Sequence, residues 1–390
     1  MTALLTPTEA PAPAPAPARR GRLFLLVVAL AAAGVAGALV HLTQGTSAVG
    51  AGDVLGLLVG ASSDGTVDIV VEARLPRLLV AVVVGVALGL AGAVLQSVSR
   101  NIVASPDTLA VNAGAHLAIV TVAAFGVSLP LLGAAGVAFL GGLGAAALVL
   151  VLSGAGGSGS ARLVLAGTAI ALAMVAMTTA LLLLFTEETN GLYAWGQGSL
   201  DQNGLDGVLT FAPLVGAVLV ALLMLSRRMD LVYVGDDHAR ALGVAVTRVR
   251  ASAVVLAVLV TAAAVVLAGP IGFVGLAAPA LVRLLASGVP GLHRHAVLLP
   301  VSAAAGAVLL IGADVLIRAL IGSQSALEVP TGVVTTILGA VFLVGLARTL
   351  RVSGSTGEPP AAGVRTGLSR VRYLVLLTVL VAVTVGVVVG

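Results

Sequence analysis

The chain has 390 residues, of which 59% are hydrophobic and only 9% are charged, and its mean hydropathy is +1.17. So little polar material excludes a soluble globular protein and indicates a polytopic membrane protein. All 20 basic residues are arginines, and cysteine is absent. A P-loop ATPase needs the lysine of GxxxxGK[ST], and disulfides and thiolate metal sites need cysteine, so these classes are excluded as well.

The N-terminus predicts a disordered tail over residues 1–22, because its PAPAPAPA run favours an extended, solvated chain. Arg19, Arg20 and Arg22 then precede an apolar run over 23–42. A signal peptide is the alternative interpretation, but this run is long for one and further apolar runs follow. We therefore expect a first transmembrane helix whose N-terminus lies in the cytoplasm.

Nine further apolar runs are each about 17–25 residues long, the length that spans a bilayer as a helix. They predict an all-α fold, with a ten-helix transmembrane domain over 23–350. The nine runs are 76–97, 108–127, 131–152, 162–185, 209–226, 247–269, 271–287, 297–319 and 330–349.

The arginines indicate which loops face the cytoplasm. If the N-terminus is inside and the helices alternate in direction, all but four of the 20 arginines fall on the cytoplasmic side, as the positive-inside rule predicts. The loop with the sequence GDDHARALG, at 235–243, then lies in the cytoplasm between the sixth and seventh helices. The four exceptions are Arg74, Arg77, Arg283 and Arg318, and Arg283 has no role that the sequence suggests.

Asp314 is the one acid that lies well inside an apolar run, and Arg318 follows four residues later on the same helical face. We expect an intramembrane ion pair between them, because buried charges in membranes are usually paired. The shortage of other intramembrane carboxylates disfavours an ion-coupled carrier. A membrane-embedded enzyme is disfavoured too, because His41 and His116 are isolated and no metal site is predicted.

Seven segments follow one another in a specific order. They are RLPR at 74–77, QSVSRNIVASPDTLAVNAGA at 96–115, WGQGSL at 195–200, GDDHARALGV at 235–244, AGPIGFVGLAAPALVR at 268–283, GADVLIR at 312–318 and EVPTGVVTTILGAVF at 328–342. In this order they resemble the FecCD family, the permeases of bacterial ABC importers for ferric siderophores, vitamin B12 and haem. The chain departs from the family pattern at Ile102–Val103 and at Ala280.

The resemblance implies that the loop at 235–243 couples the permease to an ATP-binding subunit; a solvated connector is the alternative. Two acids at the start of a short helix suit the helix dipole, and a glycine suits the turn that ends it. The coupling residues are Gly235, Asp236, Asp237, His238, Ala239, Arg240, Ala241, Leu242 and Gly243.

The resemblance also implies that Arg74, Arg77 and Arg318 dock carboxylates of an extracytoplasmic substrate-binding protein, since guanidinium groups bind carboxylates in a bidentate manner. Anchoring at lipid headgroups is the alternative for the first two, and pairing with Asp314 alone for the third. Further implied partners are a second permease subunit, membrane lipid and a ferric siderophore, with vitamin B12 or haem as the alternative cargo. No cofactor and no nucleic acid are expected.

The C-terminal part repeats the layout of the N-terminus. Residues 351–370 have the composition of a flexible basic linker, and 371–390 form another apolar segment. This segment is predicted to be an extra transmembrane helix. It is either an ordinary eleventh helix or the start of a second permease unit.

Overall fold

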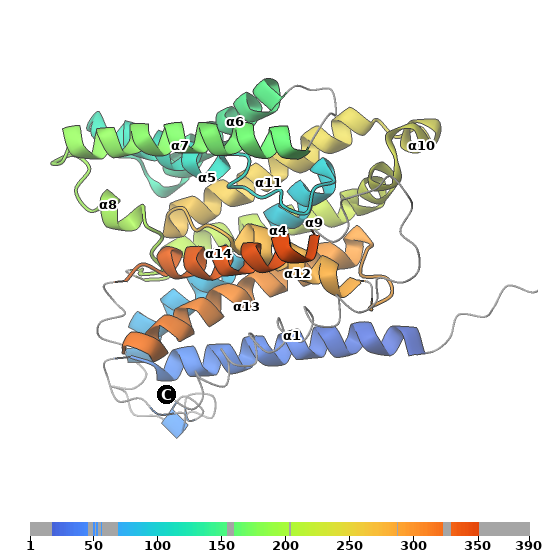
Figure 1. The fold of residues 1–390 in the computed structure, drawn as a ribbon. Coiled ribbons are helices and arrows are strands. Elements are labelled where there is room, and N and C mark those ends of the chain that lie inside the picture. Colours follow the sequence, from blue (N-terminus) through green and yellow to red (C-terminus); the bar gives the residue numbers. More distant parts are fainter. Residues whose placement is uncertain are drawn as a thin grey trace, which may run out of the picture.

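The computed structural model describes residues 18–45, 50, 52–53, 56, 69–153, 160–202, 204–286, 288–322 and 329–350. The predictions for the N-terminal tail before residue 18, the linker at 351–370 and the segment at 371–390 lie outside these ranges. The described residues form a bundle of helices (Figure 1) and contain no strand. The elements are α1 (Ala18–Thr43), η1 (Ile69–Arg74), α4 (Leu75–Ser99), α5 (Val111–Ala124), α6 (Leu131–Ser153), α7 (Ser160–Leu184), α8 (Leu192–Trp195), α9 (Asp206–Val234), α10 (Asp236–Ala241), α11 (Val246–Ala268), α12 (Val274–Ala286), α13 (His295–Ile321) and α14 (Thr331–Leu350).

Ten of these helices correspond to the ten predicted apolar runs. Among the described residues, seven are long and apolar enough to cross a membrane: α1, α4, α6, α7, α9, α11 and α13. The other three, α5, α12 and α14, are apolar but shorter. The all-helical fold predicted from the sequence is confirmed.

Several helix boundaries differ from the prediction, among them the starts of α5 and α12 and the end of α9. Helix α5 begins at Val111 rather than at 108, because the preceding residues form a turn that ends at Ala110 in a left-handed conformation (φ 55°). Helix α12 begins at Val274 rather than at 271, after a non-helical segment that follows Gly269. Helix α9 continues to Val234, past the predicted end at 226, so its charged last turns are helical.

Helix α4 lies at the centre of the bundle and is largely buried. Two of its glycines let neighbouring backbones approach closely. A Cβ atom at Gly92 would lie 1.6 Å from the carbonyl oxygen of Gly275 on α12, and one at Gly89 would lie 2.3 Å from the carbonyl oxygen of Ser302 on α13. Small residues at such positions are what allows membrane helices to pack closely without a large side chain between them.

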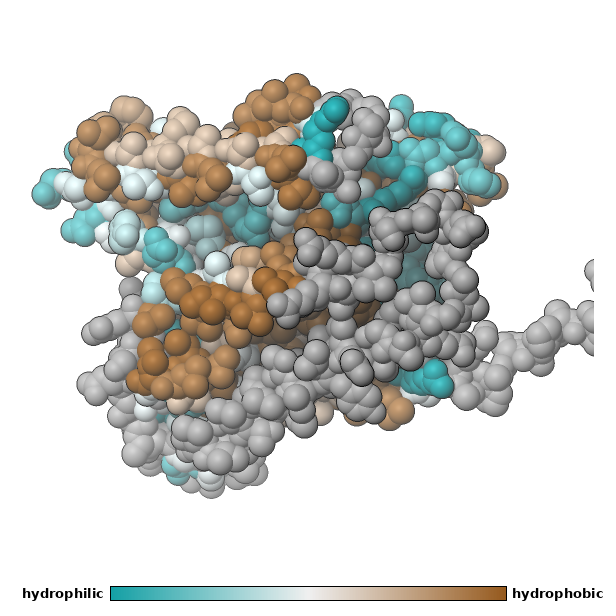
Figure 2. Space-filling model, in the orientation of Figure 1, coloured by the Kyte–Doolittle hydropathy of each residue, from teal (hydrophilic) through white to brown (hydrophobic). Residues whose placement is uncertain are grey.

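Polar residues gather at the two ends of the bundle. The start of α1 and helix α10 lie at one end, and the end of α1, the end of α13 and helix α8 lie at the other (Figure 1). Between the ends, α7 and α14 expose large apolar side chains such as Leu172, Leu184 and Val341. Figure 2 shows this apolar surface, with hydrophilic side chains concentrated near α10. An apolar belt between polar ends suits a bilayer.

Candidate functional site

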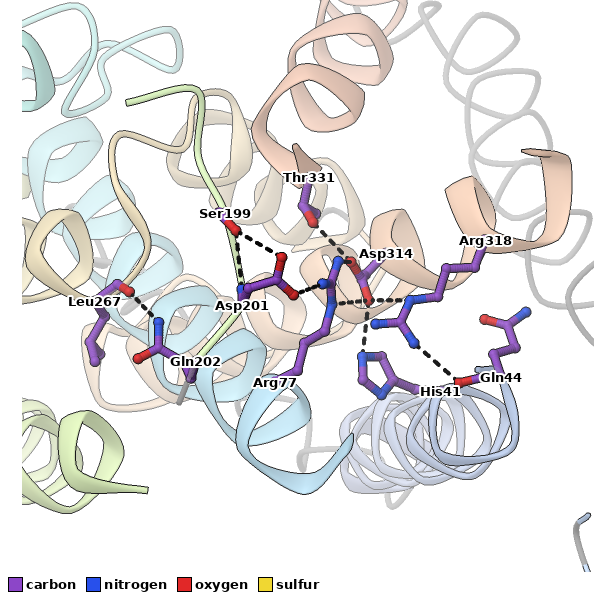
Figure 3. Close-up of polar contacts among 10 residues, drawn as sticks. All are labelled: His41, Gln44, Arg77, Ser199, Asp201, Gln202, Leu267, Asp314, Arg318 and Thr331. Atoms are coloured by element: carbon purple, nitrogen blue, oxygen red, sulfur yellow. Dashed lines mark hydrogen bonds and ion pairs between the residues drawn. The ribbon is translucent and has the colours of Figure 1, made fainter. Parts of the chain in front are cut away.

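The first candidate site is a buried cluster around Asp314, at the end of the bundle opposite α10 (Figure 3). The Asp314 carboxylate, which is 0% exposed, accepts hydrogen bonds from Arg77 Nη2 at 2.7 Å, Arg77 Nε at 3.2 Å and Thr331 Oγ1 at 2.8 Å. Arg318 Nε lies 3.2 Å from Asp314 Oδ2, and His41 Nε2 lies 3.0 Å from the same atom. We call these five residues the Asp314 cluster. They bring together α1, α4, α13 and the start of α14.

The structure places Arg77, His41 and Thr331 around Asp314, in addition to the predicted partner Arg318. Because Arg77 and His41 lie far away in sequence, the spacing of residues along one helix cannot reveal them. The expectation that His41 is isolated is wrong, since its ring contacts the Asp314 carboxylate (Figure 3). Arg77 also pairs with Asp201, whose side chain is 55% exposed. Arg77 therefore links the buried cluster to an exposed carboxylate.

The three arginines predicted to dock a binding protein all lie at this end, and all are buried, at 5–7% exposed. Their guanidinium groups contact the chain itself. Arg74 Nη1 donates to the Leu42 carbonyl oxygen at 2.6 Å, and Arg318 Nη1 donates to the Gln44 carbonyl oxygen at 3.2 Å. The guanidinium groups of these arginines therefore contact groups of the protein itself in this conformation. Their role in docking stays a prediction.

The second candidate site surrounds helix α10, which carries most of the predicted coupling residues. Arg250 Nη1 and Nη2 each donate to the Asp236 carboxylate at 2.8 Å, and Arg100 donates to the same group. Arg100 caps the end of α4 in a left-handed conformation (φ 50°) and also donates to the Val232 carbonyl oxygen at 2.6 Å. Burial opposes the charged form, but Arg250 and then Arg100 outweigh it and hold the pKa of Asp236 below its usual value. We call Asp236, Arg100 and Arg250 the Asp236 cluster.

The rest of the predicted coupling loop is largely exposed. The side chains of Asp237 and Arg240 are 95% and 61% exposed and form an ion pair with each other at 3.1 Å. Ala239 is the buried residue of α10, and Gly243 has the left-handed conformation (φ +76°) that ends the turn. Leu242 exposes an apolar side chain next to these charges. The loop thus exposes a short surface of charged and apolar side chains, and the ion pairs of Asp236 attach it to the bundle.

Arg283, which had no predicted role, joins α12 to α4. Its Nε donates to Gln96 Oε1 at 3.0 Å, and its Nη2 donates to Ser97 Oγ at 2.6 Å and to the Ala93 carbonyl oxygen at 3.3 Å. The guanidinium also lies 5.6 Å from the centre of the Tyr233 ring, near the end of α9. The residue is therefore a structural link close to the α10 end.

Sequence reasoning also missed Asp107, in the turn before α5. Its carboxylate accepts hydrogen bonds from Asn112 Nδ2 at 2.6 Å and from the backbone N–H of Phe273 at 3.3 Å. Phe273 has a positive φ of 67°, which is uncommon for a residue other than glycine. The sequence does show Asp107 as an acid between two apolar runs. Its partner Phe273, however, lies 166 residues away in the chain. Within the described ranges, no group of three or more His, Cys, Asp or Glu side chains could hold a metal ion.

The chain was compared with known proteins. The Fe(3+) dicitrate transport system permease protein FecD of Escherichia coli K12 is 39% identical over 283 residues, which cover 73% of this chain and 86% of FecD. The ferric enterobactin permease FepG of the same organism is 38% identical over 328 residues, with 83% and 94% of the two chains covered. Haemin and cobalamin permeases are also among the relatives.

A solved structure with the same fold is an inward-facing conformation of an ABC transporter of the metal-chelate type. It has a TM-score of 0.66 and 27% sequence identity, and the match covers 84% of this chain and 99% of that one. The model of the FecCD transport family matches residues 24–349, which include the ten apolar helices apart from the first residues of α1 and the last residue of α14. The chain therefore belongs to the FecCD transport family.

Proposed function

We propose that the chain is the membrane-spanning permease subunit of an ATP-driven importer of ferric siderophores, and that it forms the translocation pathway together with a second permease subunit. The resemblance to FecD and FepG, whose names specify ferric citrate and ferric enterobactin, supports a ferric chelate as cargo. Haem and vitamin B12 are the alternatives, because permeases for haemin and cobalamin are related as well.

The observation that carries the proposal is the geometry of the α10 loop. ATP hydrolysis must occur on another subunit, since the chain has no lysine for a P-loop. Such a subunit needs a rigid surface against which it can push. Helix α10 is fastened to α4 and α11 by the ion pairs of Asp236, and it exposes Asp237, Arg240 and Leu242. A coupling loop requires this combination, in which one residue attaches the loop to the long helices and other side chains stay accessible to the ATP-binding subunit.

The arginine-rich end that carries α10 is assigned to the cytoplasm, in keeping with the positive-inside rule. The opposite end then faces an extracytoplasmic substrate-binding protein. Arg77 is the arginine best suited to dock it, because it already contacts an exposed carboxylate, that of Asp201. A carboxylate of the binding protein could bind in place of Asp201 without leaving Arg77 unpaired.

A second permease subunit supplies the other wall of the pathway. Exposed apolar side chains on α7 and α14, including Leu172, Leu184 and Val341, offer a surface that either another subunit or lipid can cover. This surface supports a dimer interface.

The test is uptake into proteoliposomes that contain the full-length chain with its ATP-binding subunit and its binding protein. Radioactive iron is supplied as a ferric siderophore, with and without ATP inside the vesicles and with excess vitamin B12 or haem as competitor. We expect uptake of iron that requires ATP and resists both competitors. Uptake blocked by one competitor would change the cargo and keep the mechanism, whereas uptake indifferent to ATP would contradict the proposed function.

A further inference from the structure

A cavity of about 400 Å³ lies beside the coupling loop, between the last turns of α9 and the first turns of α11. Its lining combines apolar side chains with two arginines, Arg228 from α9 and Arg248 from α11. It belongs neither to the Asp236 cluster nor to the Asp314 cluster. The lining residues are Leu225, Arg228, Leu242, Gly243, Val244, Ala245, Arg248, Val249 and Ser252.

Neither arginine has a polar partner within the described ranges. Both are exposed, and no ion pair or hydrogen bond joins the guanidinium group of Arg228 or Arg248 to any part of the chain that the structure describes. Helix α11 also begins here without a side-chain cap, since its N-cap residue is Ala245. The first backbone N–H groups of a helix favour negative charge. The cavity thus has positive charge on two sides, and an anion would complement it.

The residues around the cavity indicate which kind of anion would fit it. Val220, Met224 and Arg228 are spaced four residues apart on one face of α9, and the first two are exposed apolar residues, Met224 at 81%. On α11, Val255 is exposed and shares a face with Ser252 and Arg248. Each helix therefore carries exposed apolar side chains on the same face as its cavity arginine, and the arginine lies nearer to the α10 end of the bundle.

We propose that this cavity binds the phosphate headgroup of an anionic phospholipid. Arg228 and Arg248 contact the phosphate, and the acyl chains lie along the exposed apolar residues of α9 and α11. Leu242, Gly243 and Val244 line the same cavity and belong to the loop that leads out of α10. A bound lipid therefore touches the coupling loop directly, and the lipid composition of the membrane can affect how the loop is held.

Lipid binding can be measured by native mass spectrometry of the full-length chain in a neutral detergent. Phosphatidylglycerol and phosphatidylcholine with the same acyl chains are titrated in parallel. The test variant is Arg228→Gln with Arg248→Gln. The matched control is Arg227→Gln with Arg294→Gln, which removes two exposed arginines that do not line the cavity. Both variants lose the same charge, so general attraction to anionic lipid falls equally in both.

We expect the wild type and the control to prefer phosphatidylglycerol. The test variant should lose roughly thirtyfold in its affinity for this lipid, since each of the two arginines near an anionic surface contributes about 1 kcal/mol. Equal losses in both variants would contradict a specific site. Displacement of the lipid by millimolar inorganic phosphate would show that the cavity binds free phosphate, and would overturn the lipid assignment. Loss of the bound lipid when the ATP-binding subunit is added would show that this subunit occupies the cavity, and would likewise overturn the proposal.

Discussion

The two ends of the bundle each carry an aspartate between two arginines, but the surroundings differ. Asp314 is completely buried and is held by groups from four helices. Asp236 has a side chain that is 25% exposed, and it connects a six-residue helix to the ends of two long ones. Ion pairs between an aspartate and two arginines therefore have two roles in this protein. The Asp314 cluster determines how the helices pack, whereas the Asp236 cluster attaches a peripheral element that a partner can reach.

The difference in burial leads to different energetic expectations. Removing one partner of a buried ion pair leaves an unpaired charge in the protein and costs about 3–5 kcal/mol. An ion pair near the surface contributes about 0–1 kcal/mol, because water screens it. Substitutions at the first cluster should therefore affect stability, and those at the second should affect transport.

The largest effect is expected for Asp314→Ala, which leaves the guanidinium groups of Arg77 and Arg318 without a buried counter-charge. We expect the variant to lose about 3–5 kcal/mol of stability, measured as a large drop in its thermal unfolding midpoint in detergent. The control is Asp201→Ala, which also removes a partner of Arg77 but at an exposed position. If both variants unfolded at the same temperature, burial would not distinguish the two carboxylates.

The next effect concerns helix α4, which joins the two clusters. Gly92→Ala places a methyl group against the backbone of Gly275, where the carbonyl oxygen cannot move aside easily. Overpacking of this kind costs about 1–3 kcal/mol. Gly144→Ala is the control, because a Cβ atom at Gly144 on α6 meets nothing within 4 Å. Thermal unfolding of the two variants compares them directly, and equal midpoints would contradict the close packing of α4 on α12.

A smaller effect on stability, with a larger one on transport, is expected for Asp236→Ala. The free energy of unfolding should fall by about 1 kcal/mol or less, because the ion pairs are partly exposed. ATP-dependent uptake should be strongly reduced, since α10 loses its attachment to Arg100 and Arg250. Asp206→Ala, an exposed acid at the start of α9, serves as the control in the same proteoliposomes. Normal uptake by Asp236→Ala would show that α10 does not need this attachment.

The smallest effect is the pH dependence of the Asp236 contribution. The pKa of Asp236 is lower in the folded chain than its usual value, so the ionised group stabilises the fold above that usual value, near pH 4. The stabilisation is lost only as the pH falls through the lowered pKa. The difference in unfolding midpoint between wild type and Asp236→Asn should therefore stay constant from neutral pH to about pH 4 and vanish below it. A difference that disappears in mildly acidic buffer would point to another titrating group.

Much of the fold could be predicted from the sequence, because long apolar runs between arginine-rich loops leave few alternatives to membrane-spanning helices. The pairing of Asp314 with Arg318 was accessible as well, since both lie on one helix face. His41 and Arg77 could not be found in this way, because contacts between distant helices depend on packing rather than on local pattern. The end of α9 was misplaced since Arg227, Arg228 and Asp230 look like a loop once the apolar run stops, although helices continue beyond the hydrocarbon core.

The burial of the three arginines that are predicted to dock a binding protein could not be found from the sequence either, because it depends on packing between distant segments. An arginine at the end of an apolar run looks accessible in the sequence, yet Arg74, Arg77 and Arg318 are all at most 7% exposed. Their guanidinium groups donate to backbone carbonyl oxygens and pair with carboxylates of the chain itself. A substrate-binding protein would have to compete with these internal partners, among which Asp201 has a side chain that is 55% exposed.

Helix α4 carries Arg77 near its start and is capped at its end by Arg100, so one element takes part in both clusters. Its 25 residues make a rod of roughly 37 Å at 1.5 Å per residue. Gly89 and Gly92 of this rod lie close against the backbones of α13 and α12, so a bend in α4 would also have to displace these two helices. A continuous path therefore runs along α4 from one end of the bundle to the other. We expect a signal between the two ends to travel by movement of α4 together with α12 and α13 as one rigid unit.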